Sequence, residues 1–203
     1  MGTKAKGSPS WQGSLGRKIL WGLLGTFWIL PLIAMAFTDE VDWDALDFVV
    51  AGGLLGGTGL LFEFVARRHH DLLYRMAAGV SLAAVLMLIW ANLAVGLIGS
   101  EGHPANLLYL VVIATGLLGA WKVRLKARGM ARVLYLMAFL QGVIAIAAIA
   151  AQWAYPVNDA WDLMRGHGFF VLLFVGAGWL FQRAALSDAA SLGNSSPLSP
   201  QRS

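Results

Sequence analysis

Few residues of this chain could carry chemistry, and most of them are acids and histidines in short polar segments. The chain has no cysteine and four histidines, so thiolate metal sites and cysteine nucleophiles are excluded. Carboxylates combined with imidazoles can bind a divalent metal ion or pass protons. The candidates for such a site are Asp39, Glu40, Glu101, His103 and His167. Their spacing matches no established metal motif, so a structured turn with local capping is the alternative.

Three further polar side chains, Glu63, Asn92 and Gln141, lie inside long apolar segments. Glu63 is the only acidic residue there, which makes it a candidate for proton binding. It also precedes Arg67 by four residues, the favoured order for a helical ion pair, so an interfacial salt bridge is the preferred interpretation. Amides in lipid seek partners on neighbouring helices. We therefore expect Asn92 and Gln141 to form interhelical hydrogen bonds, with the lining of a polar cavity as the alternative.

Several kinds of membrane chemistry are not expected. No histidine or lysine lies in the middle of an apolar segment, which disfavours a haem held by two histidines and a retinal Schiff base. The G-x-S-x-G elbow, the P-loop and the dinucleotide fingerprint are absent. We predict no cofactor, assign no catalytic residue and leave a metal open.

Six apolar segments must position these residues, and they predict an all-α, polytopic membrane helix bundle. The chain is 58% hydrophobic and 13% charged, too little charge for the surface of a soluble domain. About 20 helical residues cross a bilayer, and lipid leaves only helices or closed barrels as spanning structures. The six transmembrane helices are expected at 19–37, 48–66, 76–98, 107–121, 133–153 and 169–186.

These helices form one predicted transmembrane domain over residues 17–186. Residues 1–16 and 187–203 are rich in Ser, Gly and Pro and are predicted to be disordered cytoplasmic tails. The loops are short, so sequential helices are expected to be antiparallel neighbours.

Charged residues at the ends of the segments predict the orientation. Six crossings place 14 of the 15 Lys and Arg residues on one side, and eight of the 11 acids on the other. The positive-inside rule then makes both termini cytoplasmic, with Arg165 as the only basic residue outside. The basic side is suited to anionic lipid, and no basic run interleaved with aromatics points to nucleic acid.

The first segment has a second interpretation. Basic residues, an apolar run and Ala34-Met35-Ala36 resemble a signal peptide, whose cleavage would leave five spans and an outside N-terminus. The apolar run is longer than the usual run of about 7–15 residues, so we favour a retained helix.

The second segment contains overlapping small-xxx-small pairs formed by Gly52, Gly53, Gly56 and Gly57. Such pairs let a neighbouring backbone approach closely. Packing within the chain is the preferred interpretation. A homodimer or a larger membrane complex formed through these glycines, or a flexible gating helix, is the alternative.

The stretch 37–43 followed by Asp47-Phe48, the string 90–106 and the run 128–132 resemble a group of small bacterial membrane proteins usually called hypothetical. The resemblance spans most of the chain and implies a multi-pass location in the bacterial inner membrane, with no known activity. The expected function is non-enzymatic, as a carrier of a small solute or ion or as an accessory membrane subunit. The alternative is a membrane enzyme or metal-dependent site on the outer loops around Glu101, His103 and His167.

Overall fold

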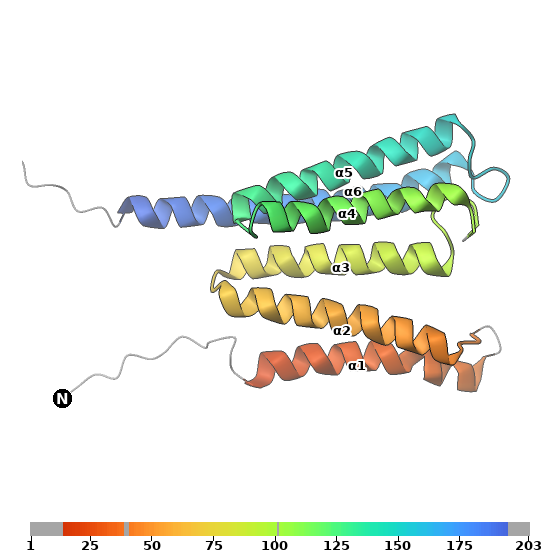
Figure 1. The fold of residues 1–203 in the computed structure, drawn as a ribbon, viewed down its shortest axis with the longest axis horizontal. Helices are drawn as coiled ribbons and strands as arrows, with labels where there is room; N and C mark the ends of the chain where they lie inside the picture. Colours follow the sequence, from red (N-terminus) through yellow and green to blue (C-terminus); the bar gives the residue numbers. More distant parts are fainter. Residues whose placement is uncertain (1–13, 39–40, 101, 195–203) are drawn as a thin grey trace, which may run out of the picture. The chain divides into compact units, whose positions relative to one another are not determined.

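The computed structural model of the chain describes residues 14–38, 41–100 and 102–194 (Figure 1). These residues contain helices and no strand. The elements are α1 Ser14–Phe37, α2 Ala45–Arg68, α3 Leu72–Ala94, the 3-10 helix η1 Pro104–Leu107, α4 Leu108–Lys122, α5 Ala127–Ala150 and α6 Ala160–Asn194. The predicted all-α class is confirmed, and six of the described helical segments are long and apolar enough to cross a membrane.

Most helix boundaries differ by a few residues from the predicted ones, and the fourth and sixth segments differ most clearly. The predicted fourth segment, 107–121, is shorter than the roughly 20 residues that cross a bilayer, but η1 continues directly into α4, and together they give a helical segment of 19 residues. Helix α6 starts at Ala160 and runs to Asn194, so residues 187–194, predicted to belong to a disordered tail, are helical. Leu15 to Phe37 fall in one helix, α1, which continues through Pro31.

The chain divides into two compact units between residues 70 and 71. The first unit contains α1 and α2, and we call it the N-terminal hairpin. Asp44 starts α2 with a capping box, in which its carboxylate accepts the N–H groups of Leu46 and Asp47. Trp28 packs across Gly52, and Leu24 and Trp21 pack across Gly59. Two glycines of α2 therefore bring the helices of the hairpin close together.

The second unit contains α3 to α6, and we call it the four-helix unit. Helix α6 packs against both α3 and α5, and α4 packs against α5. Sequential helices are neighbours for α4–α5 and α5–α6, as expected, whereas α3 and α4 make little contact. Close approach again depends on glycine, because Gly116 and Gly119 of α4 meet Met137 and Val133 of α5.

Each unit carries opposite charges at its two ends. In the four-helix unit, Tyr74 at the start of α3 donates a hydrogen bond to the carbonyl of Leu125 in the α4–α5 loop, so both belong to one end. At the other end, Gly99 N–H donates to Asn158, which joins the α3–η1 and α5–α6 loops. We call these the basic end and the acidic end. The basic end carries Arg75, Lys122, Arg124, Lys126, Arg128 and Arg132, and the acidic end carries Asp159, Asp162 and the exceptional Arg165.

Candidate functional site

The outer-loop candidates do not form a metal site in the part of the chain that the structure describes. Asp39, Glu40 and Glu101 lie outside the described residues. His103 caps η1, since its Nδ1 accepts the N–H of Ala105 at 3.2 Å. Among the described residues, no group of three or more histidines and acids is placed to hold a metal ion.

The α3–η1 loop is held by hydrogen bonds from a buried asparagine. Asn106 Oδ1 accepts the N–H of Ile98 at 3.0 Å, and its Nδ2 donates to the carbonyl of Ser100 at 2.8 Å. Gly99 adopts a φ of +69°, a left-handed conformation that glycine tolerates. The loop is therefore the structured turn that the sequence offered as the alternative to a catalytic or metal site.

His167 lies inside the four-helix unit, although the sequence grouped it with the outer loops. It is 1% exposed, and its Nδ1 lies 2.9 Å from the carbonyl oxygen of Leu163. Its Nε2 lies 2.7 Å from the hydroxyl oxygen of Tyr109 on α4. Because a carbonyl only accepts, Nδ1 carries a proton, and in the neutral imidazole that burial favours, Nε2 accepts the hydroxyl proton of Tyr109. Both ring nitrogens of a neutral imidazole are therefore engaged, and neither is free to ligate a metal ion.

Gln141, near the middle of α5, is the most unusual polar residue of the unit. It is fully buried, and neither its Nε2 nor its Oε1 has a hydrogen-bond partner. The interhelical hydrogen bond expected for it is not formed. Asn92 on α3 is half-buried, and its Oδ1 also lacks a partner. Buried polar groups are usually hydrogen-bonded, so each exception needs an explanation.

The helix register places these groups at successive depths. Contacts of Gly116 with Met137 and of Gly119 with Val133 align α4 and α5 antiparallel, which puts Val112 at the level of Gln141. Tyr109 lies almost one turn nearer the acidic end than Val112. The ring contact between Tyr74 and Phe181 aligns α3 with α6 and puts Asn92 at the level of Leu163.

From the acidic end inward, polar groups therefore occur on three levels. Asn92 comes first, the bonded pair of Tyr109 and His167 second, and Gln141 third. We call these four residues the polar column.

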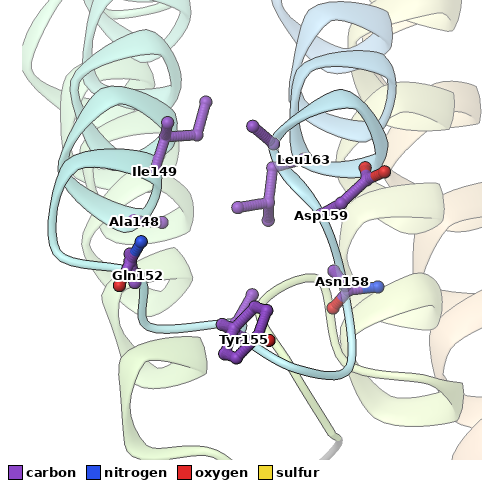
Figure 2. Close-up of a pocket in the computed structure, with 9 residues that line it drawn as sticks. Ala148, Ile149, Gln152, Tyr155, Asn158, Asp159 and Leu163 are labelled. Atoms are coloured by element: carbon purple, nitrogen blue, oxygen red, sulfur yellow. The ribbon is translucent and has the colours of Figure 1, made fainter.

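A pocket of about 160 Å³ opens between α5 and α6 at the acidic end (Figure 2). Ile149 and Leu163 lie on its two sides, and the carboxylate of Asp159 points away from the space between them. Leu163 belongs to both features, because it lines the pocket and its carbonyl accepts from His167. The full lining is Ala148, Ile149, Gln152, Ala154, Tyr155, Asn158, Asp159, Ala160 and Leu163.

Glu63 lies in the N-terminal hairpin, and the salt bridge predicted for it is formed. It pairs with Arg67 one turn later on α2. Two side chains of α1 also contact it: Trp21 Nε1 donates to Oε2 at 3.2 Å, and Arg17 Nη1 lies 3.8 Å from Oε1. The sequence does not reveal this second role, because contacts between helices are not visible in their spacing. Glu63 is thus a polar link between α1 and α2.

Together, the six apolar helices are compatible with an integral, multi-pass membrane protein. No protein-family model, no curated protein and no solved structure matches the chain.

Proposed function

We propose that the chain is a non-enzymatic carrier of a small solute in the bacterial inner membrane, with both termini cytoplasmic. The orientation is supported by the opposite charges at the ends of each unit. Arg17 and Arg67 both approach Glu63, so the basic residues of α1 and α2 gather at one end of the hairpin. The bacterial inner-membrane location rests on the sequence resemblance. The basic ends would face the cytoplasmic leaflet, where anionic lipid attracts lysine and arginine.

The carrier function rests on one observation, the buried amide of Gln141 without a partner. Burial of an amide without a hydrogen bond costs about 1–3 kcal/mol in proteins. A solute that supplies the missing hydrogen bonds recovers this cost. The amide also lies at the inner end of the polar column, two helical turns from a pocket lined by Ala148 of the same helix. An accessory subunit would need neither an unpaired buried amide nor a pocket near it.

The test is solute flux through the full-length protein in sealed vesicles of phosphatidylethanolamine and phosphatidylglycerol. Swelling of the vesicles is followed by light scattering with acetamide, glycerol, potassium acetate and choline chloride, and proton entry is followed with an internal pH dye. We expect at least one of these to enter faster than into protein-free vesicles, and Gln141→Leu to abolish the difference. If none enters faster, the protein is not a carrier.

The alternative, an enzyme or metal site on the loops, has weaker support. His103 and His167 both use ring nitrogens in structural hydrogen bonds. Of the three residues of this site, only Glu101 then remains as a ligand, and one carboxylate is too few for a divalent ion in a protein site.

We also propose a homodimer through α2. Trp28 fills the space beside Gly52, where a Cβ atom would lie 3.1 Å from its Nε1. A Cβ atom at Gly53, Gly56 or Gly57 would meet nothing within 4 Å. Gly53 and Gly57 form a small-xxx-small pair that permits close helix approach. We expect Gly57→Leu to convert a detergent-solubilised dimer into a monomer in light-scattering measurements, whereas Leu61→Ala, which leaves these glycines intact, retains the dimer. A wild-type monomer under the same conditions would rule the dimer out.

A further inference from the structure

If the chain is a carrier, as proposed above, the hydrogen-bonding groups of Gln141 indicate the chemical class of its solute. A neutral amide offers two N–H donors and a carbonyl oxygen with two acceptor positions. In Gln141, the nitrogen and the oxygen are both unpaired. A ligand that satisfies both must itself carry a donor and an acceptor close together.

The surroundings of Gln141 are unfavourable for an ion. The middle turns of all four helices lack Asp, Glu, Lys and Arg, across residues 76–100, 105–121, 133–158 and 166–182. None of the groups that the register brings to its level is charged. Val112 on α4 and Phe170 and Phe174 on α6 are apolar and buried, and the hydroxyl of Ser81 on α3 already donates to the carbonyl of Ala77. An ion without a counter-charge would lose its hydration there at a cost of several kcal/mol. A neutral molecule avoids this cost.

The nearby imidazole does not change this conclusion. His167 is 1% exposed and has no acidic residue in the middle turns around it, and burial without a counter-charge favours the neutral imidazole, so it supplies no counter-charge for an anion. It also leaves no ring nitrogen free to bind a cation.

The pocket between α5 and α6 lies on the acidic-end side of this site. Gln141, Ile144 and Ala148 follow one another on the buried face of α5. Ala148 lines the pocket and is seven residues from Gln141, which corresponds to about 10 Å along a helix. Ile144 lies between them, so a solute must displace an apolar side chain and pass the Tyr109–His167 pair to reach the amide.

We infer that Gln141 binds a small uncharged solute of the amide or urea class, which pairs its own N–H and C=O groups with the side-chain amide. Amide-to-amide pairing uses one donor and one acceptor on each partner, and both bonds form in a site of low polarity, where hydrogen bonds are strong. A glycerol-like polyol satisfies the same groups with poorer geometry, and an ion does not satisfy them without a charge partner.

The test measures binding at the side chain itself. The full-length protein is labelled with 15N in glutamine side chains and placed in lipid nanodiscs, and acetamide is titrated in. The Gln141 signal is the one lost in Gln141→Leu and in Gln141→Met, two variants with apolar side chains of similar length. We expect a saturable shift of this signal, with no saturable shift for Gln152 or Gln182, which are exposed. Potassium acetate and choline chloride should produce no saturable shift.

Removal of two hydrogen bonds should weaken binding at least about tenfold, since roughly 1.4 kcal/mol corresponds to one factor of ten. Acetamide binding measured by equilibrium dialysis should fall by this factor in Gln141→Leu. The inference is overturned if the Gln141 signal does not move with acetamide, or moves equally with potassium acetate or choline chloride.

The two proposals fail separately. If potassium acetate enters through the protein, Gln141→Leu abolishes this flux and acetamide does not bind, then the proposed substrate class is refuted and the carrier function stands. Acetamide binding without flux of any solute refutes the carrier and leaves the binding site.

Discussion

At the residue scale, the Tyr109–His167 pair and Gln141 differ in how their polar atoms are satisfied. Both sites are fully buried in the four-helix unit. The pair is closed, because the phenol, both imidazole nitrogens and the carbonyl of Leu163 are bonded in series. The Gln141 amide is open at both atoms. Substitutions at the two positions should therefore change stability in opposite directions.

Tyr109→Phe should destabilise the four-helix unit. The change removes the hydroxyl and leaves Nε2 of His167 as a buried acceptor without a donor, at a cost of about 1–3 kcal/mol. Denaturant unfolding in micelles measures the free energy of unfolding. Tyr155→Phe is the control, because Tyr155 is 76% exposed and should lose little. Equal effects of the two changes would show that the hydrogen bond to His167 adds nothing to stability.

Gln141→Leu should raise the free energy of unfolding by about 1–3 kcal/mol while it abolishes solute flux. Leucine has a similar volume and no polar atoms, so it removes the cost of the unpaired amide. Gln182→Leu is the matched control, and it should slightly lower stability because Gln182 Oε1 accepts from Tyr135 at 3.0 Å. A large loss of stability in Gln141→Leu would contradict the assignment of an unpaired amide.

At the element scale, packing within each unit depends on where glycine removes a Cβ atom. In the hairpin this happens on α2, where Trp28 crosses Gly52 and Leu24 crosses Gly59. In the four-helix unit it happens on α4 and on α6, where Gly178 receives the ring of Tyr135. Other glycines, such as Gly176 on α6, have no neighbour within 4 Å of the Cβ position. These two kinds of glycine should respond differently to alanine.

Gly119→Ala should lower the free energy of unfolding by about 1–3 kcal/mol. Its Cβ would lie 2.7 Å from both methyl carbons of Val133, and a β-branched side chain has little freedom to move away. Gly176→Ala is the control, and it should be neutral or slightly stabilising because alanine favours helix. Thermal unfolding in micelles compares the two variants. A neutral Gly119→Ala would mean that α4 and α5 are less closely packed than their geometry indicates.

At the scale of the whole molecule, the charges at the ends of the helices make a prediction about orientation. A reporter enzyme that is active only in the cytoplasm should be active when fused after Ser203. The same reporter inserted in the α5–α6 loop after Val157 should be inactive, because the acidic end faces outward in the proposed orientation. The reverse pattern would place the termini outside.

Much of the fold can be predicted from the sequence because it depends on local properties. All six apolar segments form helices, since length and apolar composition decide what can span lipid. The Glu63–Arg67 pair is predictable for the same reason, because four residues bring side chains together on any helix. The helical extension of α6 to Asn194 was missed, because the Ser-rich composition after residue 186 suggested disorder.

The sequence by itself determined the six helices and the charge at their ends. Only the tertiary structure decided that α6 lies against both α3 and α5, that His167 faces Tyr109, and that Gln141 is enclosed without a partner. The physical reason is that these helices are apolar on nearly every side, so no hydrophobic stripe indicates which face turns inward. Rotation about each helix axis is then set by close packing at Gly116, Gly119 and Gly178, and this depends on residues far apart in the chain.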